Sequence, residues 1–172
     1  MERAVDTGKI LAYALKLELD GRRFYLAMER KSKSPLGKKT LKAIADDEIR
    51  HIREIRRTAE DFKWVLNKPA KTGAAGKKWQ TIFSEAIRDK RLTKANLTDL
   101  KAFKVAMKLE TKGYDYYKKS AKKIADLKGK KFFEFLAAEE NGHYGIFERT
   151  YNYLKDPENW FKGEEKPIYE GG

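Results

Sequence analysis

Apolar residues recur at steps of three and four positions along the first part of the chain, the spacing that places them on one face of an α-helix. Over residues 5–30 this pattern comprises Ile10, Tyr13, Ala14, Leu17, Phe24, Tyr25 and Met28. It stops at residues 31–35, where Ser34 can cap a following helix and Pro35 suits a first helical position. We therefore predict a helical hairpin whose second helix ends at about Phe62.

The second half of the chain predicts a matching hairpin over about residues 97–155. Thr98 is a candidate cap for a helix that runs to about Lys123. A turn near residues 125–129 then leads into a fourth helix. The C-terminal tail, residues 156–172, is predicted to be irregular.

An internal repeat with an offset of 92 positions relates the two hairpins. Each half carries the pattern E-x-x-G-x-x-[FY]-Y and, 30 residues after its first Glu, the pattern E-x-x-H. The offset places the second-half residues Glu110, Gly113, Tyr117, Glu140 and His143 on the first-half residues Glu18, Gly21, Tyr25, Glu48 and His51. Such a match in register is not expected by chance, so the two halves should share one structure.

The spacing within each hairpin predicts where its two glutamates lie. The first-half pair is centred on position 33 and the second-half pair on position 125, both in predicted turns. In antiparallel helices, residues equidistant from the turn lie at the same height, here roughly 20 Å away at 1.5 Å per residue. The four carboxylates are therefore predicted to meet in one layer near the middle of the helices.

Residues 63–96, between the hairpins, are too numerous for a simple loop. They contain turn-forming residues at 67–76 and a short helical candidate at 81–90. A connection of this length can run along the whole bundle, so that a pseudo-two-fold axis relates the hairpins, as in ferritin-like folds with one crossover. The predicted fold class is all-α, a ferritin-like four-helix bundle of two helical hairpins joined by a long crossover. We predict that residues 1–172 form this bundle as a single domain.

The repeated residues form a candidate metal site. Two E-x-x-H pairs and one glutamate from each of the other two helices supply the ligand set of carboxylate-bridged di-iron or di-manganese bundles. The candidate metal ligands are Glu18, Glu48, His51, Glu110, Glu140 and His143. Four buried carboxylates would cost several kcal/mol per charge without metal, whereas two divalent cations would balance their charge of about −4. Iron or manganese suits this donor set; zinc and a purely structural cluster are the alternatives.

Three further pairs of positions adjoin the candidate ligands: Gly21 and Gly113, Tyr25 and Tyr117, and Asp47 and Glu139. Each glycine costs about 1 kcal/mol within a helix, which a close helix approach or a helix bend would explain. The tyrosines lie two turns beyond a ligand, as candidate catalytic residues or as ordinary core aromatics. The acidic pair either supports the ligands or faces solvent.

Composition excludes several kinds of site. The 172 residues are 41% apolar and 38% charged, and they include no cysteine. This apolar fraction can fill one core, and the sequence cannot form disulfides, thiolate zinc sites or cysteine-ligated iron centres. No secretory signal pattern opens the sequence, and no apolar run approaches the roughly 18–20 residues of a membrane span. We therefore expect a cytoplasmic protein.

The net charge of +13 comes from 39 basic and 26 acidic residues. Basic residues are spread along the whole chain and interleaved with acids, as in residues 50–57. Such a charge is typical of a protein that binds nucleic acid or another anionic partner. It is also typical of the ion-pair-rich surface of a heat-adapted protein, and the sequence leaves both interpretations open.

The motifs resemble those in the ferritin-like domain of rubrerythrins, and the resemblance covers roughly residues 5–155. The matching segments are ELDGRRFY at 18–25, DDEIRH at 46–51, ETKGYDYY at 110–117 and AEENGH at 138–143. The resemblance implies a non-haem di-iron centre, with two iron ions held by the six candidate ligands, that reacts with hydrogen peroxide or dioxygen. Rubrerythrins commonly have an additional ligating glutamate where this chain has Gly113. Full-length members also carry a rubredoxin domain, so electrons would come here from a separate rubredoxin-like donor.

From this resemblance we expect an oxidoreductase that reduces hydrogen peroxide or dioxygen in oxidative-stress defence, assembled as a homodimer. A ferroxidase or iron-handling protein is the alternative. A basic nucleic-acid-binding helical module with a vestigial metal site is an alternative of another class.

Overall fold

Four long helices and two short ones form the computed structural model, which describes residues 7–63, 81–88 and 98–164. The long helices are α1 (Thr7–Lys31), α2 (Pro35–Asp61), α5 (Asp99–Lys123) and α6 (Leu127–Lys155), and the short ones are α3 (Ile82–Arg88) and α7 (Pro157–Glu164). No strand occurs within the described ranges, and the predicted all-α, ferritin-like class is confirmed. The predicted turn at residues 67–76 lies outside them.

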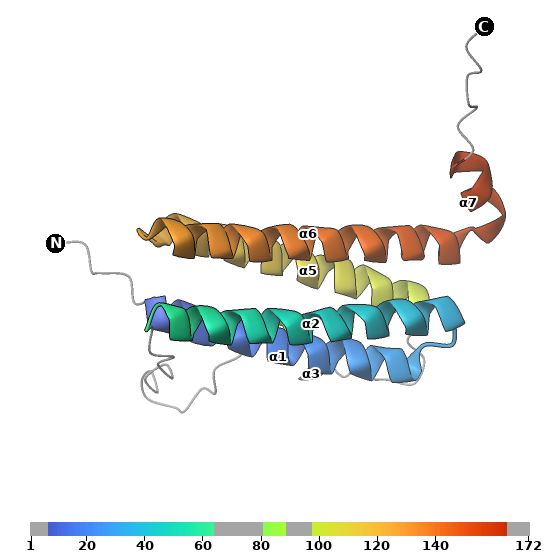
Figure 1. Ribbon diagram of the computed structural model, residues 1–172. Helices are drawn as coiled ribbons and strands as arrows, with labels where there is room; N and C mark the ends of the chain where they lie inside the picture. Colours follow the sequence, from blue (N-terminus) through green and yellow to red (C-terminus); the bar gives the residue numbers. More distant parts are fainter. Residues whose placement is uncertain (1–6, 64–80, 89–97, 165–172) are drawn as a thin grey trace, which may run out of the picture.

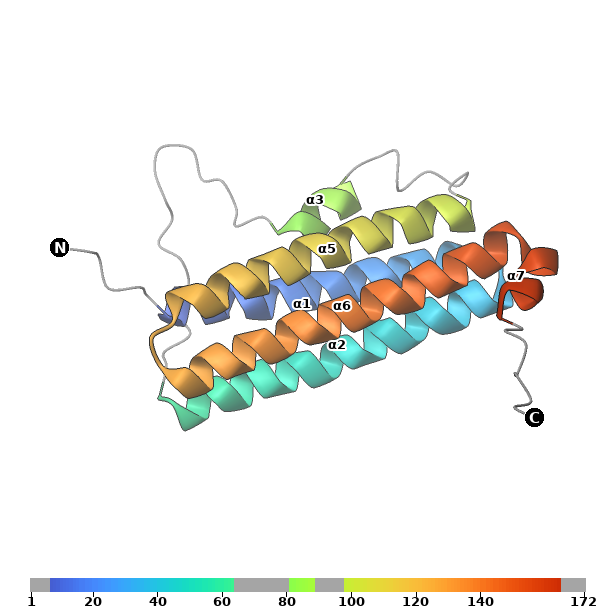
Figure 2. The same ribbon diagram turned by 90° about the horizontal axis from the view of Figure 1, so that it is seen from above.

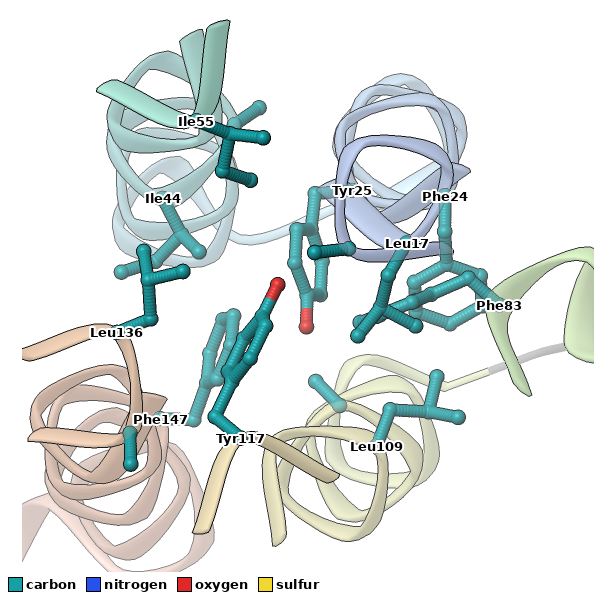
Figure 3. Packing of buried hydrophobic residues seen from close by; sticks show 14 of the residues in the cluster. Leu17, Phe24, Tyr25, Ile44, Ile55, Phe83, Leu109, Tyr117, Leu136 and Phe147 are labelled. Atoms are coloured by element: carbon teal, nitrogen blue, oxygen red, sulfur yellow. The ribbon is translucent and has the colours of Figure 1, made fainter. Parts of the chain in front are cut away.

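The long helices form two hairpins that lie face to face (Figure 1). The most extensive packing is that of α1 on α2 and of α5 on α6; α1 also contacts α5, and α2 contacts α6. The short helix α3 lies against α1 and α5 on the outside of the bundle (Figure 2). Apolar side chains of all four long helices, together with Phe83 of α3, fill the interior (Figure 3).

Side-chain caps fix where the long helices begin. The hydroxyl oxygen of Ser34 accepts a hydrogen bond from the Gly37 N–H at 3.1 Å, and Thr98 accepts one from Lys101 at 3.4 Å, so both predicted caps are confirmed. At α6 the predicted turn is too long. Asp126 caps this helix by accepting from the Gly129 N–H at 2.7 Å, and the helix therefore begins at residue 127.

The prediction of an irregular tail is wrong for residues 157–164, which form α7. Asp156 accepts hydrogen bonds from the backbone N–H and the side-chain amide of Asn159, at 3.3 and 2.9 Å. Pro157 occupies the first helical position and Glu158 the first turn, where each favours a helix start. The start signal is thus present in the sequence, although the segment is too short for an apolar period to reveal it.

Helix α3 is anchored to α1 through a reciprocal cap. The Ser84 N–H donates to the Thr81 hydroxyl oxygen at 3.1 Å, and the Thr81 N–H donates to the Ser84 hydroxyl oxygen at 2.8 Å. The Thr81 hydroxyl donates in turn to the buried carboxylate of Asp20 on α1 at 2.7 Å. This anchor holds the fully buried ring of Phe83 against the bundle.

Polar contacts also join the two hairpins. Asp99, at the start of α5, accepts hydrogen bonds from the backbone N–H groups of Ser34 and Lys33, at 2.9 and 3.3 Å. The Tyr116 hydroxyl of α5 donates to the Ile10 carbonyl of α1 at 2.8 Å. Among the described helices, none combines the length and the apolar character that crossing a membrane requires.

Candidate metal centre

The six candidate metal ligands lie together in the middle of the bundle, and all of them are at most 3% exposed. Each long helix supplies one glutamate, and α2 and α6 each add a histidine. Their potential ligating atoms form two groups, in each of which these atoms all lie within 4.8 Å of one another. One group is Glu18, Glu48, His51 and Glu140, and the other is Glu48, Glu110 and His143. Because Glu48 belongs to both groups, it would be a ligand that two metal ions share.

Each histidine presents one ring nitrogen to the carboxylates of the centre. His51 Nδ1 lies 3.2 Å from Glu18 Oε2 and 3.3 Å from Glu48 Oε2. His143 Nδ1 lies 3.7 Å from Glu110 Oε2. The two imidazoles are stacked, with ring centroids 5.3 Å apart and planes inclined by 22°.

The outer ring nitrogens meet the acidic pair whose role the sequence left open. His51 Nε2 lies 3.4 Å from Glu139 of α6, and His143 Nε2 lies 3.6 Å from Asp47 of α2. Each histidine is thus oriented by a carboxylate of the opposite hairpin, an arrangement that fixes ring direction in metal sites. Hydrogen bonds from Arg50 and His51 lower the pKa of Glu139 despite the opposing effect of its partial burial.

Arg50 ties this acidic pair together and is the residue that the sequence reasoning missed. Its guanidinium donates a hydrogen bond to Glu139 and lies 3.7 Å from Asp47. The spacing of three residues from Asp47 is visible in the sequence. The contact with Glu139 is not, because it depends on how α2 and α6 pack.

The two tyrosines cross between the hairpins. The Tyr25 hydroxyl of α1 donates to Glu110 Oε1 of α5, and the Tyr117 hydroxyl of α5 donates to Glu18 Oε1 of α1. Both hydroxyls point into the space between the four helices (Figure 3). The rings also pack in the aromatic core, where the ring centroids of Tyr25 and Phe147 lie 5.3 Å apart. The two tyrosines therefore contribute both to core packing and to the hydrogen bonds of the centre. Burial, followed by the nearby carboxylates, raises both tyrosine pKa values well above 10.0, so both remain proton donors.

Burial and mutual repulsion control the protonation of the glutamates. Burial, and then the neighbouring Glu18 carboxylate, raises the pKa of Glu48 well above 4.5. Glu140 shifts in the same direction because of burial and the Glu110 carboxylate. The pKa of Glu18 is lowered, since hydrogen bonds with Glu48, His51 and Tyr117 outweigh its burial. The metal-free cluster therefore holds protons that divalent cations would replace.

Several buried polar atoms of the centre lack a hydrogen bond within the described residues. They are Glu48 Oε2, Glu110 Oε2 and His143 Nδ1. Buried polar atoms without partners are rare in folded proteins because each costs free energy. All three are carboxylate oxygens or imidazole nitrogens, the donors that iron and manganese accept. The residues therefore fit a pair of such ions.

The two repeated glycines serve different contacts. A Cβ at position 113 would overlap Oε2 of Glu140 and lie 3.1 Å from its carboxyl carbon, so the space beside this glycine is filled by the Glu140 side chain. At Gly21 a Cβ would meet Phe83 at 3.4 Å and Glu48 Oε1 at 3.5 Å, which is ordinary contact. A larger residue at position 113 would therefore require the Glu140 carboxylate to shift from the place that it occupies here.

We expect Tyr117→Phe to lower the free energy of unfolding of the metal-free protein by about 1–3 kcal/mol, because the buried Glu18 carboxylate loses its phenol donor. Urea unfolding monitored by circular dichroism measures the change. Tyr144→Phe is the control: its hydroxyl lies 3.3 Å from Glu148 at the surface, and its loss should cost under about 0.5 kcal/mol. Equal stability of the two variants would contradict the assigned hydrogen bond.

Comparison with known proteins agrees with this geometry. The family model described as Rubrerythrin matches residues 9–151. Among solved structures, a hypothetical protein from Pyrococcus furiosus is similar, with a TM-score of 0.62 and 21% sequence identity over 88% of this chain and 92% of that chain. At this identity the likeness concerns the fold. No curated protein matches the sequence.

Proposed function

Since this chain belongs to the rubrerythrin family, we propose that it is a non-haem di-iron oxidoreductase that reduces hydrogen peroxide, or dioxygen, in defence against oxidative stress. The observation that supports this proposal most directly is the pair of ligand groups that share Glu48. Two ions held by these groups could act together on one small oxidant. A buried structural cluster would have no need for three unpartnered donor atoms.

The ligand groups define which residues would hold each ion. Glu18, Glu48, His51 and Glu140 would hold one, and Glu48, Glu110 and His143 the other. Bound there, two iron ions would supply the electrons for cleavage of the O–O bond and act as Lewis acids. The carboxylates would balance their charge, and the outer carboxylates of Asp47 and Glu139 would keep the imidazoles in place.

The remaining side chains supply protons and exclude water. Reduction of hydrogen peroxide to two waters consumes two protons and two electrons. The Tyr25 and Tyr117 hydroxyls hold protons beside Glu110 and Glu18 in the interior. Since the core around them is apolar, proton movement would be confined to these polar groups. The electrons would come from a separate small redox protein of rubredoxin type.

Anaerobic titration of metal-free protein with Fe(II) tests the centre. We expect two ions bound per chain, and loss of this stoichiometry in a His51→Ala/His143→Ala double variant, because each ligand group then loses its imidazole. The loaded protein is next mixed with hydrogen peroxide in a stopped-flow spectrometer. Rapid oxidation of the di-Fe(II) form would support peroxide reduction. Slow oxidation by peroxide, with many turnovers of added Fe(II) under dioxygen and retained iron, would favour the ferroxidase alternative.

One observation favours a second candidate function, binding of nucleic acid. Helix α5 exposes the lysines Lys101, Lys104, Lys108, Lys112, Lys118, Lys119, Lys122 and Lys123. Within the described residues none of them forms an ion pair, whereas on α2 Lys42 pairs with Asp46. The ion-pair interpretation of the high charge therefore does not extend to α5. Retention on duplex DNA that persists at near-physiological salt would support this function, and elution at modest salt would remove it.

A further inference from the structure

A pocket of about 360 Å³ opens between α5 and α6 and reaches the metal centre. Glu110 and Glu140, two of the candidate ligands, line it. Both are buried, and Glu110 Oε2 makes no hydrogen bond within the described residues. The pocket is therefore lined by two candidate ligands, one of which has an unpartnered carboxylate oxygen.

The lining of this pocket is rich in oxygen donors. The exposed carboxylate of Asp115, the Thr111 hydroxyl and the Asn141 amide lie along it, between solvent and the two buried glutamates. Carboxylate, hydroxyl and amide oxygens are the donors that hard divalent cations prefer. The negative charge of Asp115 raises the local concentration of cations near such an opening.

The pseudo-two-fold repeat supplies an internal comparison. On the α1–α2 face, the positions equivalent to Thr111, Asp115, Asn141 and Tyr144 hold Leu19, Arg23, Ile49 and Ile52. Three of these are apolar and one is a cation, so none of the four positions offers an oxygen donor to an approaching ion. The Phe83 ring of α3 also lies 3.4 Å from the position of a Cβ at Gly21. The ligands of the two halves match, but the residues on the α5–α6 face differ from those at the equivalent positions of the α1–α2 face.

We propose that the pocket between α5 and α6 is the port through which divalent metal ions enter the centre, with Asp115 as the first carboxylate that they meet. This proposal rests on the metal centre of the proposed function but not on its reaction with peroxide. Exposed Lys112 and Lys119 lie about one turn to either side of Asp115 on α5, and neither lines the pocket. Asp115 is therefore the negative charge that offsets a basic helix face at the opening.

Stopped-flow binding of Co(II) to the metal-free protein, followed by its visible absorbance, tests the port. Asn141→Trp places an indole in the opening and should slow Co(II) loading without changing the final stoichiometry. Ile49→Trp is the matched control at the equivalent position of the α1–α2 face, and it should load at the rate of the unmodified protein. Asp115→Asn should slow loading on the order of threefold to tenfold at low ionic strength, with less effect at high salt. Asp46→Asn, which removes an exposed carboxylate on α2, should not slow it.

Equal loading rates for Asn141→Trp and Ile49→Trp would overturn the proposal, as would slower loading of the Ile49 variant. If Asn141→Trp does not fold, the pair Thr111→Trp and Leu19→Trp provides the same comparison, because Thr111 is exposed. The peroxide reaction of the iron-loaded protein is measured separately. If Asn141→Trp alone slows loading but the iron-loaded protein does not react with peroxide, the port stands and the proposed reaction is wrong. If the protein reacts with peroxide but Asn141→Trp and Ile49→Trp load at equal rates, the reaction stands and the port is wrong.

Discussion

Gly113→Ala should weaken metal binding on the order of 10- to 100-fold, the range found when the support of a metal ligand is lost. The added methyl group would occupy the space of Glu140 Oε2, so the carboxylate must shift from its present position among the ligands. Glu140 belongs to the group with Glu18, Glu48 and His51, so the ion of that group is affected first. Competition between the protein and a chelator for Co(II) measures the change in affinity.

Gly142→Ala on α6 is the matched control. Its Cβ would meet no atom within 4 Å, so the substitution should leave metal affinity unchanged and raise the free energy of unfolding by up to about 1 kcal/mol through helix propensity. Gly21→Ala should fall between the two, since its Cβ would make ordinary contacts. Unchanged affinity in Gly113→Ala would contradict this prediction, because it would show that the Glu140 carboxylate can shift without weakening metal binding.

The metal-free protein should lose stability as the pH rises from about 5 to 7. The pKa values of Glu48 and Glu140 are raised in the folded state, so above about 4.5 the folded protein keeps protons that the unfolded chain releases. The free energy of unfolding then falls by up to about 1.4 kcal/mol per pH unit for each group, until the pH reaches the pKa of that group in the folded protein. The pKa of His143 is raised too, because attraction to the Glu110 carboxylate, whose Oε2 lies 3.7 Å from its Nδ1, outweighs burial, and the stability that this contributes is lost as the pH rises above about 6.5.

Bound metal should reverse this dependence, because the ions require deprotonated carboxylates and replace their protons. Urea unfolding at pH 5, 6 and 7, with and without Co(II), measures the effect. The stabilisation by metal should grow with pH, and Glu48→Gln should flatten the slope of the metal-free protein. Glu18, whose pKa is lowered, acts in the opposite sense and only below about 4.5. A metal-free protein that becomes more stable from pH 5 to 7 would contradict the raised pKa values.

The sequence predicted those features that depend on spacing within one helix. Glu18, Glu48 and the two glutamates at the equivalent positions of the second half could be placed in one layer because helix rise is constant. The caps Ser34 and Thr98 could be identified because a capping side chain acts on its own helix. The helix α7 was missed because its eight residues are too few to show a period.

Contacts between helices could not be predicted in the same way, since they depend on how each helix is rotated about its axis. The sequence left Asp47 and Glu139 undecided and did not single out Arg50. It placed Tyr25 and Tyr117 on the correct face but could not show that each reaches the glutamate of the other hairpin. The pocket beside Asp115 depends on side-chain size on two adjacent helices.

The crossed tyrosine bonds have a consequence for the origin of this chain. Tyr25 donates to Glu110 and Tyr117 donates to Glu18. Each hairpin therefore donates a hydrogen bond from its tyrosine and accepts the equivalent bond at its glutamate. Two identical hairpins could satisfy both bonds, as in a symmetric dimer. The chain is therefore consistent with the duplication and fusion of an ancestral hairpin that once paired with its own copy. Fusion would have allowed the halves to diverge, one gaining Arg50 and the other the acidic opening at Asp115.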